Sequence, residues 1–186
     1  MADAYHHGDL RAVVLRHAAD QIAQDGVDRL SLRGLAQRAG VSHAAPAHHF
    51  GDRQGLFTAL ATEGFDLLAV ELQAAGPDLR DVAVAYVRFA LARPGHFAVM
   101  FRSDLLRADD PELTAARRRS GHALRDGVRG LEGVSDPAAV QLAAWSVVHG
   151  FASLWREGAF AGSDLLDPSA DPESAARRIV DRLAFT

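Results

Sequence analysis

Apolar residues recur along this chain with helical spacing from one end to the other. Between Leu113 and Leu131 they return every three or four positions, which is typical of a helix that buries one face. Asp110, Asp136 and Asp171 each stand directly before a proline, a pair typical of a helix start. The pattern predicts no strand, and it predicts helices at residues 9–24, 31–39, 43–49, 53–75, 79–92, 94–101, 111–131, 137–157 and 172–184.

The composition agrees with a fold built from helices. Ala and Leu supply 58 of the 186 residues, whereas Ile and Thr supply only 2 and 4. Because Ala and Leu favour helices and β-branched residues favour strands, we predict an all-α protein of about nine helices. We expect a three-helix domain over residues 1–52. A second helical domain over residues 53–186 is expected to pack directly on it, because no linker separates the two.

The segment between residues 31 and 53 predicts a helix-turn-helix. Its first helix has one apolar face and ends at Gly40, and Ser42 is placed to cap a second helix that begins at His43. That second helix carries only small residues and histidines before Phe50, so it can approach another molecule closely. Pro46 is compatible with it only in the first turn. In this motif the second helix can enter the major groove of DNA.

These residues resemble a known family. The run YHHGDL at residues 5–10, SLRGLAQRAGVSHAAPAHHFGDR at 31–53 and LFTALATEGF at 56–65 resemble the DNA-binding domain of TetR/AcrR-type transcriptional regulators. RPGHFAVMF at 93–101 and AAWSVVHGF at 143–151 resemble the helical C-terminal domain of a TetR subgroup, the WHG type. The resemblance implies a transcriptional regulator, more often a repressor, that binds a pseudo-palindromic double-stranded DNA operator as a homodimer.

The resemblance also implies DNA contacts residue by residue. An arginine of the first motif helix reaches DNA, the start of the second helix reads base edges, and the pair before Phe50 touches phosphates. Ala47 stands where the family usually has tyrosine, so one alternative is a protein of this fold with weakened DNA binding. The predicted DNA-binding residues are Arg33, Ser42, His43, Ala44, Ala45, Ala47, His48, His49 and Arg53.

The C-terminal part predicts an effector site and a dimer contact. Trp145 and His149 share a helix face, and a buried imidazole needs a hydrogen-bond partner that a ligand could supply. The 19 residues 137–155 carry no charge, so we expect burial on both sides in a homodimer. Their polar residues suit a membrane span poorly. For a small, largely apolar effector we predict the contact residues Phe97, Met100, Phe101, Trp145, His149 and Trp155.

The charge distribution bears on the DNA partner. The chain has 20 arginines, no lysine and 24 acidic residues, and its net charge of -4 argues mildly against nucleic acid. However, residues 1–53 hold six arginines and six acids, so the negative surplus lies in the remainder. The same segment holds six of the nine histidines. We therefore expect operator affinity to rise as the pH falls from about 8 toward 6.

The chain offers little for catalysis. It has no Cys, hence no disulfide and no thiolate zinc site, and no nucleophile and base stand at a recognisable spacing. We predict a regulator that is not an enzyme and has no metal or cofactor. A small helical metal-assisted hydrolase using the histidines is the rival hypothesis. The first residues lack an apolar signal segment, which predicts a cytoplasmic protein.

Overall fold

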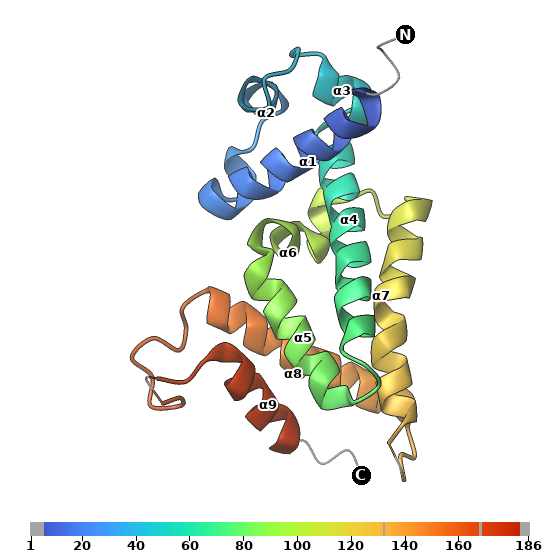
Figure 1. The fold of residues 1–186 in the computed structure, drawn as a ribbon, viewed down its shortest axis with the longest axis vertical. Coiled ribbons are helices and arrows are strands. Elements are labelled where there is room, and N and C mark those ends of the chain that lie inside the picture. Colours follow the sequence, from blue (N-terminus) through green and yellow to red (C-terminus); the bar gives the residue numbers. More distant parts are fainter. Residues whose placement is uncertain (1–5, 132, 168, 183–186) are drawn as a thin grey trace. The chain divides into compact units, whose positions relative to one another are not determined.

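The computed structural model describes residues 6–131, 133–167 and 169–182 (Figure 1). Over these residues the chain forms nine α-helices, two 3₁₀ turns and no strand, which confirms the all-α prediction. The helices are α1 His6–Asp25, α2 Leu32–Arg38, α3 Ala45–Phe50, α4 Arg53–Ala74, α5 Leu79–Ala92, α6 Pro94–Met100, α7 Pro111–Arg129, α8 Pro137–Arg156 and α9 Pro172–Arg182. The 3₁₀ turns are η1 Val27–Arg29 and η2 Ser103–Leu105. Residues 183–184 of the last predicted helix and Tyr5 of the family-like run lie outside the described residues.

The start of α3 differs from the prediction. The helix begins at Ala45, with Ala44 as its N-cap residue, and no side chain caps it. The prediction that Ser42 caps a helix beginning at His43 is therefore wrong. Instead the Ser42 carbonyl accepts a hydrogen bond from the Ala45 N–H at 3.0 Å. Pro46 has no N–H to donate, and this is harmless only in the first turn, so the helix starts immediately before it.

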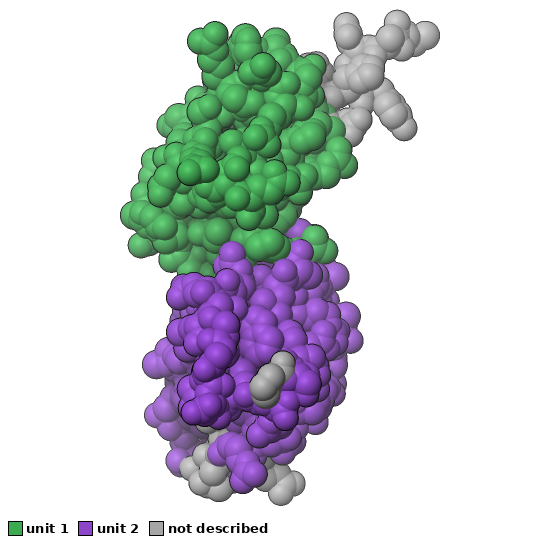
Figure 2. All heavy atoms as spheres, turned by 90° about the vertical axis from the view of Figure 1, so that its left-hand side faces the viewer, with its two compact units in different colours: residues 1–65, 93–117 green, residues 66–92, 118–186 purple. Residues whose placement is uncertain are grey.

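The chain forms two compact units, coloured separately in Figure 2. Unit 1 comprises residues up to 65 together with residues 93–117, and unit 2 comprises residues 66–92 and 118–186. This division differs from the sequence-based boundary at residue 52, because α4 and α7 each contribute to both units.

Unit 1 contains α1 to α3, the first part of α4, α6 and the start of α7. Its α1 and α6 cross closely at Gly95, where a Cβ atom would lie 2.0 Å from the Ala19 carbonyl oxygen. Phe57, Leu35 and Met100 are almost completely buried in this unit. Helix α1 is thus packed against helix α6, which lies far from it in the sequence.

In unit 2, α5 packs against both α8 and α9. Most of α5 is buried, including Phe89 and Val87 with no exposed surface. Among the described side chains, three ion pairs join α5 to α9. They are Arg80–Asp181 at 2.6 Å, Arg88–Glu173 at 2.6 Å and Arg177–Asp81 at 2.8 Å. All six groups are about half exposed, so each pair contributes little to stability.

Candidate DNA-binding and effector sites

The motif is held by local contacts that the sequence pattern specifies. Ser31 caps α2, since its Oγ accepts a hydrogen bond from the Gly34 N–H at 3.1 Å. The helix ends at Arg38. Gly40 follows with a φ of 67°, in the left-handed region, and the Val41 N–H donates back to the Ala36 carbonyl at 3.0 Å. The turn therefore returns the chain so that α3 contacts α2.

Helix α3 buries one face and exposes the other. Pro46 and Phe50 are buried, and the Arg11 guanidinium lies 5.7 Å from the centre of the Phe50 ring. The predicted DNA-binding residues that are exposed are Arg33, Ser42, His43, Ala44, Ala47 and His48, while Ala45, His49 and Arg53 are half-buried. The exposed side chains of α3 itself are thus small or imidazole groups.

Arg33 and Arg53 have different surroundings. Within the part of the chain that the structure describes, the Arg33 guanidinium on α2 forms no ion pair. Arg53, by contrast, donates from Nε to the Leu30 carbonyl at 3.1 Å and from Nη2 to the Val27 carbonyl. Its guanidinium also lies 4.7 Å from the Phe57 ring centre. Arg53 therefore joins the segment after α1 to the start of α4, a contact that the sequence did not suggest.

The predicted effector residues fall into three groups. The first, on α6 and just after it, lies in unit 1: Phe97 and Met100 are buried, and Phe101 stands 5.4 Å from both Phe97 and Phe65 between ring centres. The Met100 sulfur also lies 2.7 Å from where a Cβ on Gly64 would be. In this structure these side chains make the contacts of a packed core.

The second group forms a polar chain in unit 2. The Tyr86 hydroxyl lies 2.8 Å from Nδ1 of His149, and Trp145 also hydrogen-bonds to Tyr86. An indole N–H can only donate, so the buried hydroxyl accepts from Trp145, and it can donate its own proton to Nδ1 when the neutral His149 ring is protonated at Nε2. Burial raises the pKa of Tyr86 and lowers that of His149.

Sequence reasoning missed Tyr86 as the partner of His149. Its hydroxyl is a polar atom on a helix whose neighbouring residues are almost all apolar, and that contrast was the available signal. The third group contains Trp155, which packs with Phe151 and Phe160 at ring-centre distances of 5.5 to 5.9 Å. The C-terminal aromatic residues therefore form two distinct clusters.

The outer side of α8 exposes apolar surface. Leu142, Trp145 and Leu154 are 60%, 38% and 45% exposed. A Cβ atom on Gly150 would meet no other atom within 4 Å. Glycine in a helix interior costs about 1 kcal/mol relative to alanine, and no contact among the described residues requires it here.

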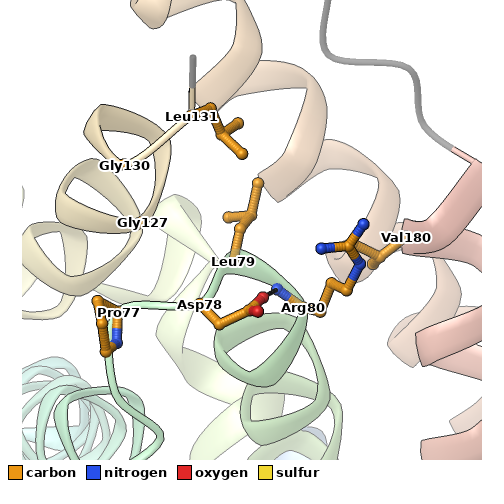
Figure 3. A pocket seen from close by; sticks show the side chains of 8 residues that line it. All are labelled: Pro77, Asp78, Leu79, Arg80, Gly127, Gly130, Leu131 and Val180. Atoms are coloured by element: carbon orange, nitrogen blue, oxygen red, sulfur yellow. Dashed lines mark hydrogen bonds between the residues drawn. The ribbon is translucent and has the colours of Figure 1, made fainter.

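A cavity of about 260 Å³ lies in unit 2 between the α4–α5 turn, the end of α7 and α9 (Figure 3). Leu79 and Leu131 extend toward each other across it, and Arg80 and Val180 border the side of α9. None of the predicted effector residues lines it. Its volume is below the roughly 300 to 1,000 Å³ usual for drug-sized ligands.

Two further observations concern metal binding and membrane insertion. In the described ranges, no group of three or more His, Asp or Glu side chains is placed to hold a metal ion. No helix in those ranges is long and apolar enough to cross a membrane.

The chain is a helix-turn-helix protein, because the short α2 is followed by a glycine turn and the exposed α3. A helical C-terminal part accompanies this motif. Two family models match the chain. The model for bacterial regulatory proteins of the tetR family matches residues 14–60, and the tetracyclin repressor-like C-terminal domain matches residues 79–183. The chain therefore belongs to the TetR family of bacterial regulators.

Individual relatives agree with this assignment. Over 92 residues the chain is 33% identical to the HTH-type transcriptional repressor Rv1474c of Mycobacterium tuberculosis, covering 50% of this chain and 46% of that protein. A protein of unknown function from Rhodococcus sp. RHA1 is 34% identical and superposes with a TM-score of 0.77 over 96% of this chain and 95% of its own. LfrR from Mycobacterium smegmatis, in complex with proflavine, shares the fold with a TM-score of 0.68 at 20% identity, covering 95% of this chain and 97% of its own.

Proposed function

We propose that this protein is a DNA-binding transcriptional repressor, not an enzyme, which binds a pseudo-palindromic operator as a homodimer. The observation that carries the proposal is the exposed surface of the motif. Arg33 on α2, His43 in the turn and His48 on α3 are exposed, and the alanines between them allow close approach to a groove. In this reading arginine and imidazole groups contact the DNA, and the alanines offer only apolar contact to thymine methyl groups.

Selection of DNA from a random pool by the purified protein tests this proposal. We expect recovery of an inverted repeat whose half-sites are about one helical turn, or a multiple of it, apart. Arg33→Ala should weaken binding to that sequence, whereas Arg29→Ala, an exposed arginine of η1 outside α2 and α3, serves as the matched control. Recovery of no sequence at low salt would count against DNA binding as the function.

The homodimer is proposed to form through α8. Its exposed Leu142 and Leu154, its uncharged length and the open space at Gly150 support close packing against a second copy. Leu142→Glu should convert the dimer to monomers in light scattering after size exclusion. Val70→Glu, at an exposed apolar residue on α4, is the control that should leave the dimer intact. A monomeric wild-type protein at micromolar concentration would refute this part of the proposal.

We further propose that a small, largely apolar effector binds the C-terminal part and releases the DNA. The polar chain of Trp145, Tyr86 and His149 offers hydrogen-bonding groups beside apolar surface, the combination usual in ligand sites. LfrR, which shares the fold, is in complex with an aromatic cation, proflavine. Such a ligand acts only if it binds the DNA-releasing conformation more tightly than the DNA-bound one.

The chain has two tryptophans, and this allows a direct test of effector binding. In Trp155→Phe the remaining emission comes from Trp145, and in Trp145→Phe it comes from Trp155. Titration with proflavine, followed by a panel of apolar amines and acids, should quench the first variant more strongly. A compound that releases DNA but changes only the emission of Trp155 would place the effector away from Tyr86 and His149.

A further inference from the structure

The loop between α6 and α7 is fastened to the start of α4. Gln54 donates from Nε2 to the Leu106 carbonyl at 3.2 Å, and the Arg107 N–H donates to Oγ1 of Thr58 at 3.0 Å. Leu106 on the loop is 3% exposed, and Thr58 in α4, which accepts from the Arg107 N–H, is also buried. The loop is therefore anchored to α4 by buried residues of both segments. Arg107 therefore has a fixed backbone position beside the first turns of α4.

The side chain of Arg107 reaches the turn that ends the recognition helix. Its Nη2 donates to Oδ1 of Asp52 at 3.0 Å. The same nitrogen lies 3.5 Å from where a Cβ on Gly51 would be and 3.1 Å from the equivalent point on Gly55. Gly51 directly follows Phe50, the last residue of α3. The guanidinium thus lies at the end of the helix that is proposed to enter the DNA.

The pair between Arg107 and Asp52 can open at little cost. The two side chains are 41% and 62% exposed, and exposed pairs of this kind contribute little to stability. Asp52 also accepts a hydrogen bond from the Gly55 N–H at 2.7 Å, which holds the carboxylate at the start of α4 without the arginine. The guanidinium has five N–H donors, so it can turn toward a phosphate while Asp52 remains in place.

The motif itself supplies few cations for a DNA backbone. Residues 31–53 contain the arginines Arg33, Arg38 and Arg53. Arg38 pairs with Asp25 at 3.5 Å, and the guanidinium of Arg53 is bonded to two backbone carbonyls. The Arg38 pair is exposed and can open as that of Arg107 can, so the motif offers Arg33 and Arg38 to phosphates, and a cation from outside the motif adds to this small supply.

We propose that Arg107 is a DNA-phosphate contact, contributed to the DNA-binding surface by the loop between α6 and α7. The proposal rests on the proposed DNA-binding function. It adds a residue that lies outside the matched DNA-binding segment 14–60. On DNA binding, the guanidinium leaves the Asp52 carboxylate and donates instead to a phosphate oxygen. That phosphate belongs to a DNA strand that passes the end of α3.

Binding of the full-length protein to a mixed-sequence duplex of about 30 base pairs tests this inference, measured by fluorescence anisotropy over a range of salt concentrations. Arg107→Ala should weaken binding at least on the order of tenfold and reduce the slope of log K against log salt by about 1.8, about 0.9 for each of the two protomers of the proposed dimer. Arg107→Lys keeps the charge and should keep most of the slope. Arg102→Ala removes an exposed arginine of the same loop, which pairs with Asp104, and should behave as wild type.

Asp52→Asn provides an independent variant, because asparagine can still accept from the Gly55 N–H while the competing charge is lost. It should tighten binding to the same duplex. A wild-type salt slope in Arg107→Ala, even with reduced affinity, would overturn the proposal and leave Arg107 as a positioning residue. An equal loss in Arg102→Ala would overturn it too. If wild-type protein fails to bind any duplex at low salt, the proposed function fails instead.

Discussion

Adding a single methyl group to Gly95 is the sharpest test of how unit 1 is assembled. A Cβ built on Gly95 lies 2.0 Å from the Ala19 carbonyl oxygen and 2.7 Å from its carbonyl carbon. Real Cβ contacts are essentially never below 3.0 Å, so α1 and α6 must separate by about 1 Å. Both clashing groups belong to the backbone, and therefore no side-chain rotation relieves the contact.

The expected size of the effect follows from overpacking. Forcing one methyl group into a packed interior costs about 1 to 3 kcal/mol, and replacing a helical glycine with alanine returns at most about 1 kcal/mol. Because neither backbone can move alone, we expect Gly95→Ala to lower the unfolding free energy by about 2 kcal/mol. For a chain of this length that corresponds to a fall in Tm of roughly 4 to 8 °C.

Two other glycines calibrate the measurement, which uses thermal unfolding followed by far-UV circular dichroism. In Gly64→Ala the new methyl meets the flexible Met100 sulfur at 2.7 Å, so a smaller loss of about 1 kcal/mol is expected. In Gly121→Ala it meets only the end of the Arg125 side chain at 3.3 Å, and Tm should rise by a few degrees. Equal Tm values for Gly95→Ala and Gly121→Ala would refute the close crossing of α1 and α6.

Four smaller predictions concern individual side chains. Burial lowers the pKa of His149 below its ordinary 6.5, so the unfolded chain binds the proton more readily, and stability is lost as the pH falls through 6.5. The drop in Tm between pH 7.5 and pH 5.5 should therefore be smaller in His149→Gln than in the wild type. A drop of equal size in both proteins would contradict this prediction. Tyr86→Phe removes the hydroxyl between Trp145 and His149 and should cost about 1 to 3 kcal/mol in urea unfolding. Arg53→Ala removes the guanidinium that joins two backbone carbonyls and should lower Tm while leaving the salt slope of DNA binding unchanged. A reduced slope would indicate a phosphate contact instead. Arg33→Ala should leave Tm unchanged and weaken operator binding by about 1 to 3 kcal/mol, measured by anisotropy.

The helices could be predicted from the sequence because their signals are local. Asp136 caps α8 through a 3.0 Å bond from the Ala139 N–H, as its place before a proline indicated. All nine predicted segments coincide with helices, and the ends within the described residues differ by at most three residues. The error at His43 is also local in origin. A capping serine and a proline gave competing signals, and the proline determined where the helix begins.

The candidate sites were less predictable because their contacts join residues distant in the chain. Tyr86 meets His149 across 63 positions, and Arg107 meets Asp52 across 55. Helical periodicity tells which face of a helix is apolar, but it does not tell which other helix covers that face. For the same reason the sequence grouped Phe97 with Trp145 as effector residues, although the structure places them in different compact units.

The zero net charge of residues 1–53 argues less strongly against DNA binding than the sequence alone suggests. Asp25 and Asp52 contribute two of the six negative charges in that segment, and each is paired with an exposed arginine, Arg38 and Arg107. Arg107 lies outside the segment, so counting charges by position in the chain omits a cation that stands beside α3. Exposed pairs exchange partners cheaply, and a phosphate is a stronger acceptor for a guanidinium than water. The positive charge available to a DNA backbone therefore depends on which arginine side chains can turn outward. The fold of unit 1 decides this, and the net charge of the segment does not.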